Sequence, residues 1–97
     1  MGKYVLLLNW TDQGVKNVKD TIKRAESFKS YLEKRGGKVT HLFYTFGQYD
    51  LVVTAELPSD EIAMSVSLGT GALGNVRVTT LKAFDLDETR RIVDELK

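Results

Sequence analysis

The sequence predicts an α+β fold built on a four-stranded antiparallel sheet, and three observations support this prediction. Four runs rich in β-branched and aromatic residues occur at about residues 3–10, 39–46, 49–56 and 76–84. Helical patterns of apolar residues separate the first run from the second and the third run from the fourth. A further helical pattern follows the last run. The order β-α-β-β-α-β with a C-terminal helix is that of a ferredoxin-like fold, which carries its helices on one face of the sheet.

Residues 3–10 form a continuous apolar run, which predicts a central strand that is buried on both faces. Thr11 and Asp12 then supply side-chain oxygens for a helix N-cap. Apolar residues recur after them at steps of three and four, which predicts one long amphipathic helix. The Gly36-Gly37 pair ends this helix, because one of the two glycines can adopt the left-handed conformation of a C-cap. The apolar face of the predicted helix consists of Val15, Val18, Ile22, Ala25, Phe28 and Leu32.

Residues 39–56 predict a β-hairpin, because two β-rich runs meet at Gly47. Glycine at the first central position suits a type II′ turn, which requires a positive φ there. Placing Phe46 opposite Tyr49 fixes the register, and directly opposite residues share a face of the sheet. One face then carries Thr40, Leu42, Tyr44, Phe46, Tyr49, Leu51, Val53 and Ala55, and the other carries Val39, His41, Phe43, Thr45, Asp50, Val52, Thr54 and Glu56.

The first of these two hairpin faces is almost wholly apolar, and we expect it to pack beneath the helices. The second face is mixed, and we expect it to point away from them. The strand at residues 3–10 is apolar at both odd and even positions, so both of its faces should be buried. The chain itself supplies nothing to cover the second face. A second copy of the same sheet is the usual solution. The sequence therefore predicts a homodimer, or a higher homo-oligomer, that closes as a dimeric α+β barrel.

The second half of the chain completes the predicted fold. Pro58 and Ser59 begin a second helix, which we expect to be short and to end in the glycine-rich residues 69–75. Asp85 and Glu88 have the spacing of a capping box and begin the C-terminal helix. The chain contains no internal repeat, low-complexity segment or linker. Residues 1–97 are therefore predicted to form a single domain.

Composition excludes several classes of function. Fourteen basic and thirteen acidic residues leave a net charge of +1, whereas domains that bind nucleic acid through bulk charge are usually clearly basic. The absence of cysteine removes disulfides, thiolate nucleophiles and thiolate metal sites. The apolar run at residues 4–8 is too short to span a bilayer, and no signal-peptide cleavage pattern follows it. We therefore expect a cytoplasmic protein that binds neither nucleic acid nor membrane.

His41 is the only side chain whose usual pKa lies near neutrality. It could act as a general base or a ligand inside the barrel, or it could be an interface histidine bonded to Thr54. With no second histidine and no cysteine, no metal-ligand set is recognisable, so neither a metal nor a cofactor is expected. Asp50 could orient a polar ligand, or it could accept backbone N–H bonds that lock the hairpin.

Asn9 and Trp10 end the first strand, where an amide and an indole could line the mouth of a pocket or serve only in capping and packing. The candidate catalytic residues are thus His41, Asp50, Tyr49 and Asn9. The candidate ligand-binding residues are His41, Phe43, Asp50 and Trp10.

Residues 69–74 spell GxGxxG, the spacing of a dinucleotide-binding loop. That chemistry requires the loop to follow a strand and to open a helix whose N-terminus receives the pyrophosphate. Here the loop follows a predicted helix and precedes a strand. We therefore reject a nucleotide cofactor and expect the glycines to end the helix.

Gly47, Tyr49 and Asp50 form a Gly-x-Tyr-Asp signature, and with it the chain resembles the GYD-domain family of small bacterial proteins. This resemblance implies a dimeric α+β barrel of ferredoxin-like subunits. The biochemical role of the family is not established, so the resemblance implies no catalytic residues. The other segments that carry it are residues 4–11, 13–15, 36–37 and 73–77.

The hairpin is also similar to that of the Lrp/AsnC ligand-binding domains, which bind amino acids at subunit interfaces, although their helix-turn-helix is missing here. The same barrel superfamily contains cofactor-independent monooxygenases and haem-degrading enzymes. The haem enzymes use an asparagine near the first strand, which Asn9 matches loosely, and a histidine on a helix, whereas His41 lies on a predicted strand.

Two hypotheses follow for function. The favoured one is a homodimeric barrel that binds a small, partly apolar molecule or serves as an assembly module. The alternative is a cofactor-independent monooxygenase- or isomerase-like enzyme that acts on an aromatic or quinone-like substrate. The alternative requires His41 and Asp50 to lie within hydrogen-bond reach of one bound molecule.

Overall fold

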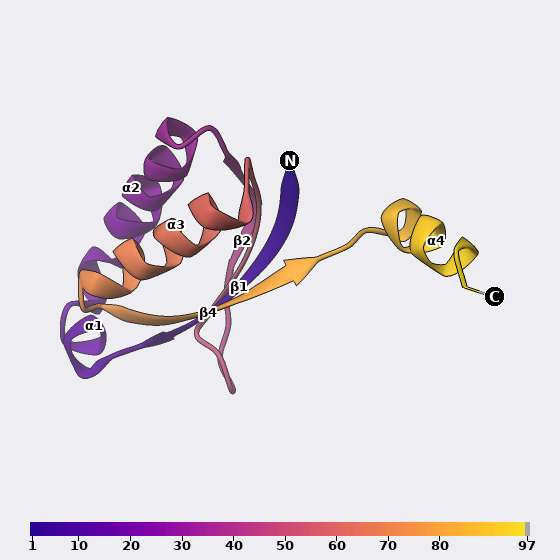
Figure 1. Cartoon of the computed structure of the whole chain (residues 1–97). Coiled ribbons are helices and arrows are strands. Elements are labelled where there is room, and N and C mark those ends of the chain that lie inside the picture. The colour runs from indigo at the N-terminus through magenta and orange to yellow at the C-terminus, as the bar shows by residue number, and fades with distance from the viewer. Residues whose placement is uncertain (97) are drawn as a thin grey trace.

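The computed structural model describes residues 1–96 of the chain. Its four strands form one antiparallel sheet in the order β2-β3-β1-β4, and α2 and α3 cover one face of that sheet (Figure 1). This is the predicted ferredoxin-like arrangement with a C-terminal helix. The elements are β1 (Gly2–Trp10), α1 (Asp12–Lys16), the 3₁₀ turn η1 (Val18–Asp20), α2 (Thr21–Lys34), β2 (Lys38–Tyr44), β3 (Leu51–Leu57), α3 (Asp60–Ala72), β4 (Val76–Ala83) and α4 (Leu86–Asp94).

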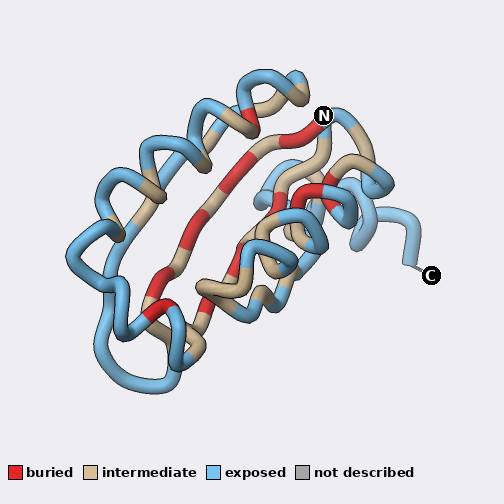
Figure 2. Tube along the Cα trace, turned by 90° about the vertical axis from the view of Figure 1, so that its left-hand side faces the viewer, coloured by how far each residue is buried: buried red, intermediate tan, exposed pale blue. Residues whose placement is uncertain are grey.

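The core lies between the sheet and the two covering helices. Alternate residues of β1 and β3 are buried, as the period of two requires, and Leu6 pairs directly with Val53. Leu32 of α2 and Val66 of α3 pack onto them from above and are fully buried. Figure 2 shows this alternation of buried and half-buried positions along the strands. Burial of these apolar side chains is what holds the helices on the sheet.

The other face of the sheet is not covered by a helix in residues 1–96. Val5 and Leu7 of β1 are half-buried rather than buried, so the expected burial of this strand on both faces does not occur within one chain. We call this surface the open face. From the strand pairing it comprises Val5, Leu7, His41, Phe43, Val52, Thr54, Arg77, Thr79 and Leu81.

The predicted hairpin register is confirmed at residues 41–44, where His41 lies opposite Thr54. A β-bulge between Val39 and His41 then shifts the pairing by one residue. Val39 therefore pairs with Ala55 and packs against the core, whereas we expected it on the mixed face. The bulge was not predictable from the alternation of apolar residues, because the extra residue, Thr40, is as β-prone as its neighbours.

The hairpin tip also differs from the prediction. The strands end at Tyr44 and Leu51, so residues 45–50 form a longer connection in place of a two-residue turn. Gly47 does have the expected positive φ, at 134°. Phe46 is fully exposed and does not join the core as its parity suggested.

The predicted single long helix is wrong. The chain forms the short α1, turns through η1 and only then enters α2, with Asn17 outside helical geometry at φ −103° and ψ 24°. This break changes the helical phase, so the apolar residues before it do not continue the inward stripe of α2. As a result Val15 and Val18 are exposed; Ile22, which lies within α2, is exposed as well. The predicted caps at Thr11 and Gly36 are confirmed.

The helix α3 is longer than predicted and runs through Gly69 and Gly71 to Ala72. Gly74 makes the turn into β4 with a φ of 88°. The GxGxxG pattern therefore lies within and after a helix and before a strand, which is the wrong context for a pyrophosphate.

Two segments distant in sequence, residues 13–14 and 73–75, are packed together at one end of the sheet. The Gln13 side chain donates hydrogen bonds to the Leu73 carbonyl at 3.1 Å and to the Asn75 side chain at 3.0 Å. Gly14 is buried, and a Cβ built on it would lie 2.0 Å from the carbonyl oxygen of Asn75. A side chain at this position would therefore force the segments apart.

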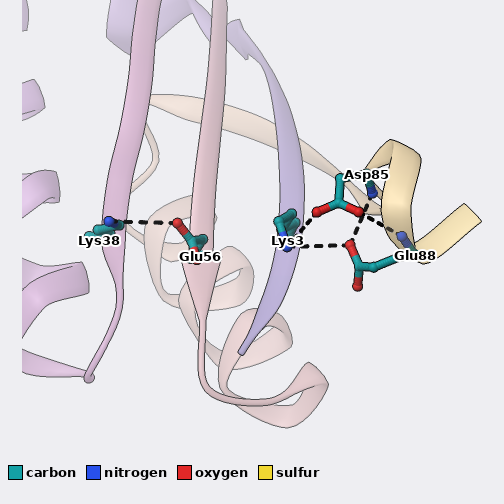
Figure 3. Close-up of polar contacts among 5 residues, drawn as sticks. All are labelled: Lys3, Lys38, Glu56, Asp85 and Glu88. Atoms are coloured by element: carbon teal, nitrogen blue, oxygen red, sulfur yellow. Dashed lines mark hydrogen bonds and ion pairs between the residues drawn. The ribbon is translucent and has the colours of Figure 1, made fainter.

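The helix α4 stands apart from the rest of the chain at the end of β4 (Figure 1). Its N-terminus has the predicted capping box between Asp85 and Glu88. Lys3 of β1 reaches both carboxylates, at 3.2 and 3.3 Å respectively (Figure 3), while Lys38 and Glu56 pair across β2 and β3 at 3.7 Å. The first turn of α4 is thus tied to the start of β1.

These contacts shift the pKa values of the groups at the start of α4. The backbone N–H of Glu88 and then the Lys3 ammonium hold the pKa of Asp85 below its usual range. The backbone N–H of Asp85 and then Lys3 do the same for Glu88, and the two carboxylates raise the pKa of Lys3. The charged forms are therefore favoured in the folded protein.

Candidate functional site

A cavity of about 640 Å³ lies between the helices α2 and α3 and the sheet. Its wall is mostly carbon, and its size is within the range of sites that bind small molecules. We call it the helix-side cavity. Its apolar wall is formed by Leu8, Trp10, Phe28, Leu42, Leu51 and Val53, with Tyr31, Leu73 and Val76 at its edges.

The local sequence explains why space remains here. Ala25 of α2 and Gly69 of α3 line the cavity and have little or no side chain with which to fill it. Gly69 also admits the Tyr31 hydroxyl, since a Cβ at position 69 would lie 3.1 Å from that oxygen. Larger residues at these two positions would close the space between the helices and the sheet.

One end of the helix-side cavity is polar. Thr21 and Tyr44 bond to each other there, with their hydroxyl oxygens 3.1 Å apart. Tyr44 also donates its hydroxyl proton to the Thr21 carbonyl at 3.2 Å. These bonds join the N-terminus of α2 to the edge strand β2.

Arg24 lies in the wall beside this polar end. One terminal nitrogen of its guanidinium group, Nη1, donates to the Asn17 carbonyl at 2.8 Å. The other, Nη2, is buried and has no hydrogen-bond partner within residues 1–96. Asp20 and Lys23 also line this end, but no ion pair joins Asp20 to Arg24 in the part of the chain that the structure describes.

Trp10 is the one residue of the predicted site that lines the helix-side cavity. Its ring centroid lies 6.5 Å from that of Tyr44. The Asp50 carboxylate accepts the backbone N–H of Trp10 at 2.9 Å, and the Asn9 side chain donates to the Gln48 carbonyl at 2.8 Å. Asp50 and Asn9 thus anchor the hairpin tip to the end of β1 and hold Trp10 in place.

The other predicted site residues lie elsewhere. His41 is exposed on the open face, where its Nδ1 is 3.3 Å from the Thr54 hydroxyl and its ring stacks on Phe43. Tyr49 is half-buried in the hairpin tip, and its carbonyl accepts the Thr45 hydroxyl. Along β2, His41 is four residues from the position opposite Asp50, a separation of roughly 13 Å. The structure therefore does not bring His41 and Asp50 together around one space.

The sequence reasoning missed Arg24, although its spacing carries a signal. Arg24 follows Thr21 by three residues and precedes Phe28 by four, so it belongs to the inward stripe of α2. An arginine in an apolar stripe needs either a route to water or a partner for its charge. This requirement makes position 24 recognisable in the sequence as a candidate site residue.

Other kinds of site find no support in the described residues. Within residues 1–96, no group of three or more histidine and carboxylate side chains is placed to hold a metal ion. None of the helices described is both long enough and apolar enough to cross a bilayer.

Comparison with known proteins agrees with the fold. The family model of the GYD domain matches residues 4–93, which is nearly the whole chain. A search of curated protein sequences finds no match. The matched region includes the hairpin and also the two segments that pack together around Gly14 and Gly74. The chain therefore belongs to the GYD domain family.

Proposed function

We propose that this protein is a cytoplasmic homodimer that binds a small, partly apolar molecule in the helix-side cavity of each subunit. The observation that carries this proposal is the cavity itself, about 640 Å³ of space with a largely carbon wall inside a domain of 97 residues. Because the cavity is partly open, water reaches its largely carbon wall. A bound apolar molecule would release that water and bury the wall, which favours binding.

The lining favours an aromatic or aliphatic ligand. Trp10, Phe28 and Tyr44 present ring faces and edges around the space. Burial of apolar ligand surface against them supplies most of the binding free energy, while the hydroxyls at the polar end orient the molecule. Trp10 is the only tryptophan of the chain, so it gives a direct fluorescence signal for binding.

Homodimerisation is supported by the open face. Phe43 and Leu81 on this face are 57% and 47% exposed, and the half-buried Val5, Leu7 and Val52 lie between them. A contiguous apolar surface on a sheet is typical of an interface. Two open faces related by a two-fold axis would cover each other and form the α+β barrel expected from the sequence.

The isolated helix α4 gives a second reason to expect a dimer. The chain has a radius of gyration of 14.7 Å, against about 12.5 Å for a compact domain of this length. A helix of nine residues is not stable alone in water, yet one side of α4 is apolar and exposed. We propose that this side packs on the second subunit. The exposed apolar residues are Leu86, Ile92 and Val93 of the helix and Leu96, two residues beyond its end.

Native mass spectrometry of the purified protein tests both parts of the proposed function. We expect a dimeric mass and a bound small molecule that is released on denaturation. Ala25→Phe should fill the cavity and abolish ligand retention, whereas Ser30→Phe, on the exposed side of α2, should retain it. A monomeric mass would exclude the dimer, and equal ligand retention by both variants would exclude the cavity as the site.

We confine the proposed function to binding. The enzymatic alternative requires His41 and Asp50 at one bound molecule, but His41 is on the open face and Asp50 accepts the Trp10 N–H. No observation in the described residues favours an acid–base pair within the helix-side cavity.

A further inference from the structure

We infer that the ligand of the helix-side cavity is an apolar monocarboxylate whose carboxylate pairs with Arg24. This inference rests on the proposed function, since it names the chemical class of the molecule that the cavity would hold. It follows from the charge and the hydrogen-bond state of one end of the cavity.

Arg24 has more donor capacity than the chain uses. A guanidinium group carries five N–H donors and always keeps its charge. In residues 1–96 only Nη1 has a partner, the Asn17 carbonyl at 2.8 Å, while Nη2 is buried without one. A buried N–H donor without a partner is costly, and the cost is removed when an acceptor occupies the adjacent space.

The surroundings of Arg24 favour an anion. Lys23 lines the same end of the cavity and adds a second positive charge, and Asp20 is the only acidic residue of the wall. The local balance is therefore one net positive charge. The Tyr44 hydroxyl proton is donated to the Thr21 carbonyl, whereas the neighbouring Thr21 hydroxyl can turn to donate to a bound oxygen.

A carboxylate fits this end better than other anions. Its planar pair of oxygens matches the guanidinium fork, and such charge-assisted pairs are short and strong. Apart from the uncharged Ser27, Thr70 and Asn75, the remaining wall is apolar or aromatic, so the rest of the molecule should be an aryl or alkyl group without further charge. An apolar monocarboxylate satisfies both ends of the cavity.

Titration of the ligand-free dimer with a matched series tests this inference, with Trp10 fluorescence as the readout. Octanoate, 1-octanol and octylamine share one alkyl chain and differ only in the head group. We expect octanoate to bind about tenfold more tightly than octanol, as a charge-assisted bond predicts, and octylamine to bind more weakly than either.

Three variants test whether Arg24 is responsible for the preference for octanoate. Arg24→Met should weaken octanoate binding about tenfold and leave octanol binding unchanged. Lys29→Met removes the same charge from the exposed side of α2 and should change neither. Thermal melting without ligand checks the fold, and Arg24→Met should melt at about the same temperature, because removal of the buried Nη2 donor, which has no partner within residues 1–96, offsets loss of the Nη1 bond to the Asn17 carbonyl. Arg24→Lys, which keeps the charge without the fork, should give an intermediate loss.

The possible failures are distinguishable. If octanoate and octanol bind equally, or if Lys29→Met weakens octanoate as much as Arg24→Met does, the role of Arg24 is wrong while the cavity remains a binding site. If no member of the series binds and the native mass shows no retained molecule, the proposed function itself is wrong.

Discussion

The two faces of the sheet are formed by the same four strands but differ in what covers them. On the helix side, β1 and β3 bury large aliphatic side chains, and the helices leave a cavity beside that core. On the open face, polar and apolar residues alternate across the strands and remain partly exposed. In this fold the position of the helices, rather than that of the chain's titratable residues, determines where a ligand can bind.

The faces also differ in how their polar groups are satisfied. His41 on the open face has a hydroxyl partner and a stacked ring. In the helix-side cavity, Arg24 keeps a buried nitrogen that no described residue satisfies. An unsatisfied donor in the wall of a pocket is a better guide to function here than a histidine on an open surface.

The largest expected difference between the two faces is in the free energy of unfolding lost on substitution. Leu32→Ala empties a fully buried position between α2 and the sheet, and we expect it to lower the free energy of unfolding by about 3 kcal/mol. Leu81→Ala, at an exposed position of the open face, should cost about 1 kcal/mol or less in the monomer. Urea denaturation at low protein concentration measures both. Equal losses of unfolding free energy in the two variants would show that both faces contribute equally to the core. That result would contradict the placement of the core on the helix side.

Association should depend on the open face and on α4, and it should not depend on the outer side of α2. Phe43→Glu places a charge at the proposed dimer interface, and we expect the dimer dissociation constant to rise about thirtyfold or more, as for a central interface residue. Ser30→Glu adds the same charge to the exposed side of α2 and serves as the control. Sedimentation equilibrium measures both variants. An unchanged dimer in Phe43→Glu would exclude the open face as the interface.

The close approach of α1 to residues 73–75 can be tested by adding one methyl group. Gly14→Ala places a Cβ 2.0 Å from the Asn75 carbonyl and 3.2 Å from the Trp10 ring, so we expect a loss of about 2 kcal/mol and a shifted Trp10 emission. Gly71→Ala meets its nearest atom only at 3.9 Å and should be neutral or stabilising, because alanine favours a helix. Similar melting temperatures for the two variants would contradict the tight contact.

The smallest expected effect concerns acid. The pKa values of Asp85, Glu88 and Asp60 are lower in the folded protein than in the unfolded chain. Their contribution to stability is therefore complete above the unfolded values, near pH 4, and is lost as the pH falls through the lower folded values. Thermal melting between pH 6 and about pH 2 should follow this direction.

A variant of the Lys3 ion pairs provides the control for the acid experiment. Lys3→Met removes the ammonium that both Asp85 and Glu88 contact. The melting temperature of this variant should depend less steeply on pH in the acid range. An identical slope in the variant and the parent would show that the ion pairs do not contribute.

The sequence predicted the fold because the fold depends on local patterns. The strand order follows from element order, the register at His41 and Thr54 follows from apolar alternation, and the caps follow from single residues such as Ser59. The break at Asn17 was missed because spacings of three and four residues do not reveal a short 3₁₀ turn.

The candidate site was harder to predict because it depends on distances between elements. Trp10 was predicted as a pocket residue, but the cavity also requires the small residues Ala25 of α2 and Gly69 of α3 in its wall. A residue that is small for this reason looks, in sequence, like any other small helical residue. His41 was predicted from its chemical reactivity, whereas the wall of a cavity depends on how the helices and the sheet pack together.

The bulge at Thr40 has a consequence for how molecules of this protein meet. The strand β2 lies at an edge of the sheet, and an edge strand with a regular row of free N–H and C=O groups is a template for strand addition and fibril growth. The bulge interrupts that row near the start of β2, between Val39 and His41. An incoming strand can therefore match only a few residues on either side of it, so lateral polymerisation is discouraged while the broad surface of the sheet stays free for a single partner.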